Sequence, residues 1–169
     1  MAGHYIETGS KSKASEALVL LIENANIKDV QEILSLQKLA FQSEVKRYND
    51  FLIPPLVETI DELAMNFKSY IFLKATLDGK IVGSVRAIEK DGVCYVGRLI
   101  VHPDFQNQGI GAKLLLEIEG KFLACGRFEL FTGNKSVKNI HLYEKLGYKA
   151  FKTEPVTDNI SEIFFEKVK

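Results

Sequence analysis

Two glycines one residue apart, Gly109 and Gly111, come directly before a stretch in which apolar residues recur at every fourth position from Ile110 to Phe122. This periodicity predicts a helix that begins at the glycines. The N–H groups of a first helical turn have no partners inside the helix, and glycine allows another group to approach the backbone closely. The pattern therefore indicates a site for an anion, above all a phosphate.

Two better-known glycine motifs of phosphate sites do not fit this stretch. The dinucleotide-binding fingerprint G-x-G-x-x-G requires a third glycine where Leu114 stands. The P-loop pattern G-x-x-x-x-G-K-[ST] does not occur in the sequence. A simpler interpretation stays open, in which Gly109 and Gly111 only allow the helix to pack tightly against a sheet.

One globular domain is expected to carry this site. The chain has 169 residues, of which 46% are hydrophobic and 26% charged, which is enough for one buried core. Residues 1–16 are polar and small, and we expect a flexible tail or an expression remnant there, with the domain over residues 17–169. Cys94 and Cys125 show no metal-ligand spacing, so we expect two reduced, buried thiols and no metal.

The charge pattern restricts the partners. The chain has 22 basic and 22 acidic residues and no long block of either sign, so nothing supports a nucleic-acid surface. No apolar run is long enough to span a membrane, and the N-terminus has no signal-peptide pattern. We therefore expect a cytoplasmic protein, a monomer or homodimer, with neither nucleic acid nor membrane as a partner.

The predicted elements run in the order strand, helix, helix, three strands, helix, strand, helix and two strands. Asn26 and Thr59 mark the starts of the first two helices, and Pro54 and Pro55 are expected to keep the connector between them irregular. Asp78–Gly79 and Asp91–Gly92 predict the turns of a meander. Because the next strand follows a helical crossover, the sheet must be mixed. We predict a single α/β (α+β) domain, a mostly antiparallel sheet of about seven strands flanked by about four helices.

Two segments in this order resemble a known family. Gln106-x-x-Gly109-x-Gly111, preceded by an apolar strand and by Val101-x-Pro103, resembles the acetyl-CoA-binding signature Q/R-x-x-G-x-G/A of the GNAT superfamily of N-acetyltransferases. The stretch NIHLYEKLGYK, residues 139–149, resembles the C-terminal helix of that family, which ends in Leu-Tyr-Glu-Lys-Leu-Gly-Tyr/Phe. The resemblance extends from about Ala17 to the end of the chain.

The resemblance implies acetyl-CoA as co-substrate and a role for each matching position. In the family, backbone N–H groups of the glycine loop hold the pyrophosphate, and N–H groups of the preceding strand stabilise an oxyanion beside a local irregularity. The implied cofactor residues are Leu99, Ile100, Val101, Gln106, Asn107, Gln108, Gly109, Ile110, Gly111, Ala112 and Asn139. Tyr143 is implied as the catalytic proton donor to the leaving thiolate. Ser136, where many members carry an asparagine, is explained as a helix N-cap.

The sequence does not point to one residue as the general base that would deprotonate the amine. Members of the family often carry an acid where this chain has Arg98, and arginine cannot act as a base at neutral pH. Glu89, Asp104, Glu129 and His102 all fit ordinary structural roles, so we expect an ordered water or a partly neutral substrate in place of a protein base.

Three residues are candidates for acceptor contacts. Asp50 and Glu58 lie in the connector that lines the acceptor side in this family, and Arg98 is a candidate ligand for an anionic group of the acceptor. In the predicted hairpin Ser84 would lie opposite Arg98, and strand alternation would put Arg86 on the same face as Arg98. An open alternative explains both arginines by solvent exposure or by pairing with carboxylates under a covering helix.

These observations predict an acetyl-CoA-dependent N-acetyltransferase that acts by direct attack of a primary amine in a ternary complex. The acceptor is expected to be a small-molecule or peptide amine; a polyamine, an amino acid, an aminoglycoside and a protein N-terminus all fit. Two alternatives belong to other classes: a non-catalytic acyl-CoA-binding regulatory module, and an interaction domain that binds no cofactor.

Overall fold

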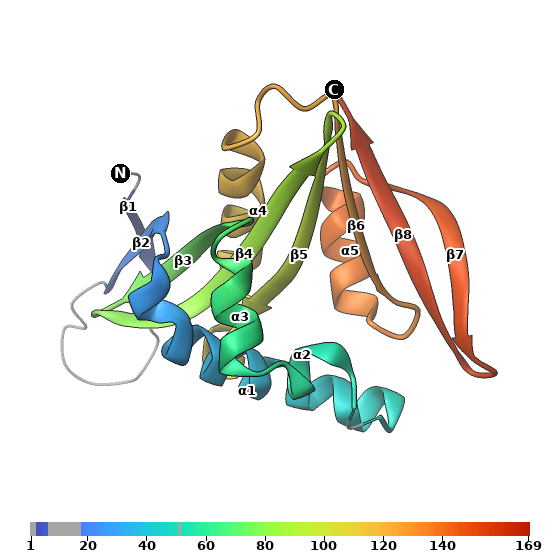
Figure 1. Ribbon diagram of the computed structural model, residues 1–169, viewed down its shortest axis with the longest axis horizontal. Helices are drawn as coiled ribbons and strands as arrows, with labels where there is room; N and C mark the ends of the chain where they lie inside the picture. The colour runs from blue at the N-terminus through green and yellow to red at the C-terminus, as the bar shows by residue number, and fades with distance from the viewer. Residues whose placement is uncertain (1–2, 7–17, 51) are drawn as a thin grey trace.

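The computed structural model describes residues 3–6, 18–50 and 52–169, which form one eight-stranded sheet with helices on both faces (Figure 1). The strands are β1 (Gly3–Ile6), β2 (Leu18–Asn24), β3 (Ile71–Leu77), β4 (Lys80–Lys90), β5 (Val93–Val101), β6 (Arg127–Gly133), β7 (Lys149–Thr157) and β8 (Ile160–Val168). The helices are α1 (Val30–Tyr48), α2 (Pro54–Val57), α3 (Ile60–Asn66), α4 (Ile110–Gly120) and α5 (Val137–Lys145). Short 3-10 turns, Ile27–Asp29 and Pro103–Phe105, precede α1 and α4.

The strands lie in the order β1-β2-β3-β4-β5-β6-β8-β7. All neighbours are antiparallel except β5 and β6, which are parallel because α4 returns the chain to the same end of the sheet. Both residues of the turns at Asp78–Gly79 and Asp91–Gly92 have positive φ, as two-residue hairpins with the twist of the sheet require. The predicted mixed, mostly antiparallel sheet is confirmed.

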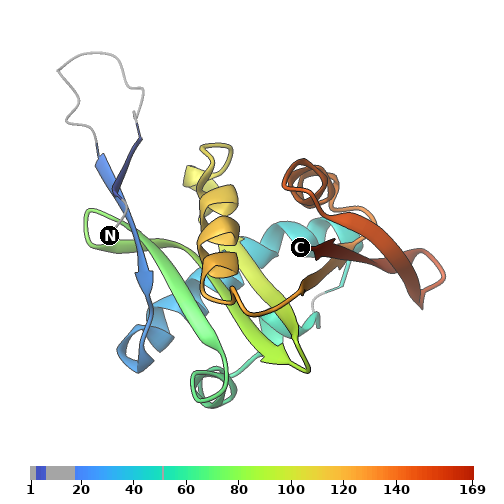
Figure 2. The same ribbon diagram turned by 90° about the horizontal axis from the view of Figure 1, so that it is seen from above.

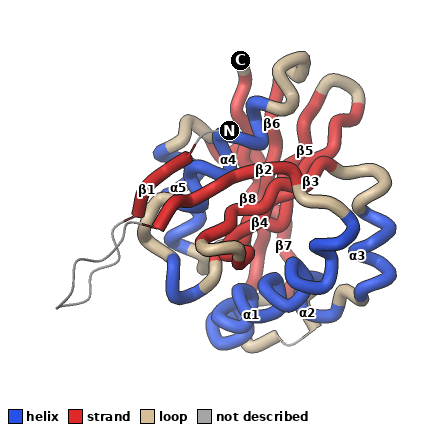
Figure 3. The backbone as a smooth tube through the Cα atoms, turned by 90° about the vertical axis from the view of Figure 1, so that its left-hand side faces the viewer, coloured by secondary structure: helices blue, strands red, loops and turns tan. Residues whose placement is uncertain are grey.

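Strand alternation divides the core between the two faces. Phe72 and Ile81 pack with α1 and α3, whereas their neighbours Leu73 and Val82 pack with α4 and α5. Figures 2 and 3 show α3 and α4 on opposite sides of the strands. The site must therefore be open at an edge or gap of the sheet, because both faces are covered.

Three details differ from the expectations. Pro54 and Pro55 do not keep the connector irregular but occupy the first turn of α2, where a missing N–H is no loss. The sheet has eight strands, since Gly3–Ile6 pairs with Leu18–Leu21 as β1, and these four residues belong to the fold and not to a tail. The rest of the predicted tail, apart from these four residues, lies outside the described residues.

Two irregularities of β5 shape the centre of the sheet. Ser84 pairs with Ile100 and Arg86 with Gly97, so Val85 of β4 faces two residues of β5, which is a β-bulge. On its other side β5 pairs with β6 only over Val93–Tyr95, after which the two strands run apart (Figure 1). The sheet is thereby split between β5 and β6.

Candidate functional site

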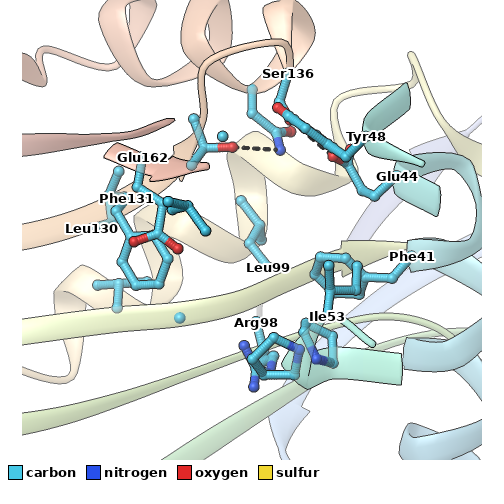
Figure 4. A pocket seen from close by; sticks show the side chains of 18 of the residues that line it. Phe41, Glu44, Tyr48, Ile53, Arg98, Leu99, Leu130, Phe131, Ser136 and Glu162 are labelled. Atoms are coloured by element: carbon cyan, nitrogen blue, oxygen red, sulfur yellow. Dashed lines mark hydrogen bonds between the residues drawn. The ribbon is translucent and has the colours of Figure 1, made fainter. Parts of the chain in front are cut away.

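A cleft of about 420 Å³ occupies the region where β5 and β6 diverge (Figure 4). Its walls come from α1, the α1–α2 connector, β5, β6, α5 and the β7–β8 hairpin. The polar side chains that line it are Glu44, Tyr48, Asp50, Tyr70, Arg86, Tyr95, Arg98, Thr132, Ser136, Asn139, Tyr143 and Glu162. The cleft therefore combines titratable groups from parts of the chain that are more than 100 residues apart.

The β5 bulge supplies the unpaired backbone of this cleft. Arg98 has a φ of 50° and Leu99 follows it, so the predicted irregularity is present and begins one residue before the expected stretch Leu99–Val101. Leu99 lines the cleft. Ile100 is buried against α1, and Val101 packs in the cluster with α4. Because pairing with β6 ends at Tyr95, the β6-facing N–H and C=O groups beyond it have no strand partner.

The glycine loop lies beside this cleft and not in its lining. Gly109, with a φ of 81°, is the N-cap of α4, and the first bond of the helix runs from Lys113 N to Gly109 O at 3.1 Å. The N–H groups of Ile110, Gly111 and Ala112 therefore precede the helical ladder. Gln106–Gly109 is exposed, and Gln106 Nε2 donates to Val101 O at 3.2 Å, which ties the loop to the end of β5.

The two glycines have different roles. A Cβ at Gly109 would meet nothing within 4 Å, so the space above this position is open and only the positive φ demands glycine. A Cβ at Gly111 would lie 3.5 Å from Leu142 Cδ2, which is an ordinary packing contact with α5. The packing interpretation thus applies to Gly111, and the open approach to the backbone applies to Gly109.

Tyr143 lies on the α5 wall of the cleft, buried and close to the aromatic rings of Tyr148 and Phe165. Its hydroxyl forms no hydrogen bond with any residue that the structure describes. Burial, and to a smaller extent the negative charge of Glu44, raises the pKa of Tyr143 well above its ordinary value. The phenol is therefore protonated at neutral pH and has a proton to donate.

Asn139 lies one turn before Tyr143 on α5 and also lines the cleft. Its Nδ2 donates to Thr132 Oγ1 at 3.3 Å. The side chain is thereby held toward β6, and its amide oxygen has no donor among the described residues. This leaves an acceptor available at the place where the resemblance implied a pantetheine contact.

A hydrogen-bonded network on the α1 side was not predicted. Ser136 Oγ donates to Glu44 Oε2 at 2.9 Å and lies 2.8 Å from the hydroxyl of Tyr48, which also accepts the N–H of Lys135 at 2.8 Å. Ser136 occupies the N-cap position of α5, as predicted, but its side chain makes no cap bond; its hydroxyl joins α5 to α1 instead. A side chain at Gly133 would collide with Tyr48, which explains the glycine at the end of β6.

Arg86 and Arg98 share one buried carboxylate, Glu58. Glu58 accepts hydrogen bonds from Gln37 at 2.7 Å, from Asn66 at 3.0 Å and from Arg86 Nη1 at 3.3 Å, while Arg98 Nε lies 3.8 Å away. Burial alone would raise the pKa of Glu58, but the bond from Gln37 and the charges of the two arginines outweigh it and hold the pKa below its ordinary value. The expected pairing of both arginines with a carboxylate is present.

Of the two connector residues expected to contact the acceptor, one lines the cleft and the other does not. Asp50 lines the cleft and accepts the N–H of Leu52 at 2.9 Å. Glu58 does not line it, because its carboxylate is turned into the cluster with the arginines, so its expected role as a free acceptor contact is wrong. The sheet register also differs from the expected pairing of Ser84 with Arg98, since the bulge shifts it.

Glu162 of β8 is the carboxylate that the sequence did not single out. It lines the cleft opposite the connector, and burial together with the negative charge of Glu154 on β7 raises its pKa. Glu89, Asp104, Glu129 and His102, which fitted ordinary roles in the sequence, do not line the cleft. Only the alternation of β8 could have pointed to Glu162, and alternation does not say which strand face borders a gap.

The described residues offer neither a metal site nor a membrane-spanning helix. No group of three or more His, Cys, Asp and Glu side chains in ranges 3–6, 18–50 and 52–169 is arranged to hold a metal ion. In the same ranges no helix has the length and apolar character needed to cross a membrane. Cys94 and Cys125 are buried and free, and burial raises the pKa of Cys94 to about 12.

The split mixed sheet, the β5 bulge and the glycine-capped α4 define an acyl-CoA N-acyltransferase fold. The chain belongs to the Acetyltransferase (GNAT) family, whose sequence model matches residues 30–148. An acetyltransferase of Pectobacterium atrosepticum is 34% identical over 93 residues, which are 52% of this chain and 64% of that protein. The chain thus matches less than two thirds of the length of this relative.

Solved structures agree on the fold. The PaiA N-acetyltransferase of Thermoplasma acidophilum in complex with coenzyme A superposes with a TM-score of 0.74 at 18% identity, covering 89% of this chain and 99% of its own. The ribosomal-protein-S18-alanine N-acetyltransferase of Escherichia coli gives 0.73 at 19% identity, covering 88% and 93%. At such identities the likeness shows the fold and leaves the acceptor to be argued from the site.

Proposed function

We propose that the protein transfers the acetyl group of acetyl-CoA to an amine that enters the cleft between β5 and β6. The observation that carries this proposal is the meeting of unpaired β5 backbone with the hydroxyl of Tyr143 in one cleft of about 420 Å³. A polarised thioester carbonyl needs N–H donors, and a departing thiolate needs a proton. The cleft offers both.

The residues around α4 fit the anionic part of acetyl-CoA. The N–H groups of Ile110, Gly111 and Ala112 and the positive end of the helix supply favourable potential without side-chain charge, which suits a chain of zero net charge. Space above Gly109 is open, so a phosphate can approach the backbone there. The unpaired edge of β5 next to this loop suits the amide groups of a pantetheine arm.

The reaction then follows as direct transfer. The nitrogen of the neutral amine forms a bond to the thioester carbon while N–H groups of the β5 bulge stabilise the oxyanion, and the bond between carbon and sulfur then breaks. Tyr143 hydrogen-bonds to the sulfur and provides its proton. The raised pKa of Tyr143 keeps that proton in place until the thiolate forms. The phenolate then takes up a proton from water, which balances the proton that the amine releases.

Glu162 is the residue we propose to accept the proton of the amine. It lines the cleft and has no cation partner among the described residues. Its raised pKa is closer to neutral pH than that of an ordinary carboxyl group, which suits a general base. This proposal differs from the expectation of an ordered water or a partly neutral substrate in place of a protein base. Glu44 is less suited, because Ser136 and Arg47 already engage both of its oxygens.

The test is release of free coenzyme A from acetyl-CoA with a panel of amines. If Tyr143 protonates the thiolate, Tyr143→Phe should lower kcat by roughly 10²-fold to 10⁴-fold with little change in the affinity for acetyl-CoA. A variant within about threefold of the wild type would mean that water supplies the proton. Thermal stabilisation by acetyl-CoA without turnover on any amine would instead indicate a regulatory module.

A further inference from the structure

Arg98 lies in the cleft with hydrogen-bonding capacity that the protein does not use. No described residue accepts a hydrogen bond from its guanidinium, and its Nε is buried without a partner. The nearest carboxylate oxygen, of Glu58, is 3.8 Å from that Nε, which is too long for a hydrogen bond. A half-buried guanidinium with five free donors is a site prepared for an oxygen ligand.

The one negative charge of Glu58 offsets only part of the positive charge of Arg86 and Arg98. Glu58 is the single carboxylate between two arginines, and Gln37, Asn66 and Arg86 already donate to it. Arg86 is satisfied further by the faces of Tyr70 and Phe72, 4.9 and 5.8 Å from its guanidinium carbon. The cluster therefore has one excess positive charge. Both arginines line the cleft, and Arg98 is the one that makes no hydrogen bond to Glu58.

The backbone at this position adds to the argument. Arg98 is the first of two β5 residues at the bulge and has a φ of 50°, a conformation that favours glycine or asparagine over a long side chain. Such backbone strain is kept where the surrounding structure or the function requires that residue. Glu58 and Arg86 already form an ion pair without Arg98, so this pair does not explain why an arginine is kept in the strained conformation.

Two carboxylates also line the cleft, Asp50 on the α1–α2 connector and Glu162 on β8, and neither forms an ion pair with any residue in the described ranges. A ligand with one positive and one negative group matches a carboxylate together with Arg98, whereas a polyamine would bring a second positive charge toward Arg98.

We propose that Arg98 binds a carboxylate of the acceptor, so that the substrate is a small amine that also has a carboxylate group. This inference rests on the proposed acetyl transfer and specifies its substrate class. Arg98 is then a specificity-determining residue: it contacts the substrate away from the reacting nitrogen. Its two parallel N–H donors suit a bidentate carboxylate.

The first experiment compares matched amines. Glycine through 6-aminohexanoate would be assayed beside alkylamines of equal length that lack the carboxylate, with spermidine and the peptides Ala-Glu amide and Ala-Gln amide as further arms. The carboxylated series should have a kcat/KM at least about tenfold higher, the effect of one charged hydrogen bond. Arg98→Gln should remove this preference mainly through KM, and Arg127→Gln, a guanidinium outside the cleft, should keep it.

The second experiment does not need turnover. In the presence of coenzyme A, binding of the acetylated acids would be measured calorimetrically against the corresponding neutral N-alkylacetamides. Tighter binding of the acids by about tenfold, lost in Arg98→Gln, supports the subsite even if no amine is acetylated, in which case the proposed transfer alone fails.

Three results would overturn the inference: equal binding of acids and neutral amides, preference for spermidine, or an Arg98→Gln variant that loses activity equally on both series. Preference for Ala-Glu amide over every amino acid would assign the carboxylate to an acidic peptide and also overturn it. Thermal unfolding separates a structural role, since Arg98→Gln should unfold within a few degrees of the wild type.

Discussion

Replacing Glu58 by glutamine tests the charge cluster that underlies the site. The substitution keeps the volume and removes the single negative charge between Arg86 and Arg98. It also places an amide nitrogen where Gln37, Asn66 and Arg86 donate, so at least one of these bonds is lost. Two guanidinium groups are then left close together without a counter-charge.

The cost follows from burial. Glu58 and Arg86 side chains are 8% and 11% exposed, and breaking a buried pair costs about 3–5 kcal/mol. Arg98 is 21% exposed, so water screens part of its charge. We therefore expect Glu58→Gln to lower the free energy of unfolding by about 3 kcal/mol, the lower end of that range. For a chain of this size that lowers Tm by on the order of 10 °C.

Thermal and urea unfolding of Glu58→Gln would be compared with Asp61→Asn, which removes the same charge from the exposed first turn of α3. Adding Arg98→Gln to Glu58→Gln should recover about 1 kcal/mol or more, because it relieves the repulsion between the arginines. If Glu58→Gln costs no more than Asp61→Asn, the cluster does not support the β5 bulge and the charge argument for Arg98 fails.

The other predictions concern pH and the glycine loop. Because the pKa of Glu58 is lower in the folded state, the stability it contributes is present above its ordinary value of 4.5 and is lost as pH falls through the folded value; the acid side of a stability profile should therefore be flatter in Glu58→Gln. Glu162 must be ionised to act as a base and its pKa is raised, so the acidic limb of kcat/KM should lie above pH 4.5 and should vanish in Glu162→Gln; an unchanged limb would exclude it. Gly109→Val should weaken acetyl-CoA binding at least about tenfold by calorimetry, while Gly111→Ala, whose Cβ meets Leu142 at an ordinary distance, should fold and bind; the reverse order would contradict the placement of the phosphates.

Sequence alone predicted the elements that local chemistry determines. Asn26 and Thr59 both form capping boxes, and Asp78–Gly79 and Asp91–Gly92 both form the expected turns. The exception at Pro54 and Pro55 has a local cause too, since proline is compatible with a first helical turn. In these cases a few neighbouring residues contain the whole signal.

The cleft could be predicted only in part, because its side chains come from distant elements. Tyr143 lies in a motif and was expected near the site, and the glycine loop, also in a motif, lies beside the cleft; Glu44, Tyr48 and Glu162 lie in ordinary amphipathic stretches and were not singled out. Their roles depend on α1 and β8 meeting at the gap between β5 and β6. Register and sheet order decide that meeting, and a one-residue bulge at β5 was enough to change the expected pairing of Arg98.

The charge of Arg98 affects the arrangement of the other charged groups in the cleft. Members of the family often have an acid at this position of β5, where it would accept the proton of the attacking amine. This chain has the positively charged Arg98 there. Its cleft carboxylates without an ion-pair partner among the described residues are on the α1–α2 connector and on β8. With an arginine in place of the acid, Arg98 and Arg86 lie close together. The one negative charge of Glu58, which Gln37 and Asn66 hold in place, offsets only one of the two positive charges. Under the two proposals made above, the amine would be directed toward Glu162 and its anionic group toward Arg98. Arg98, which stands where the family often has an acid, would then also select the acceptor.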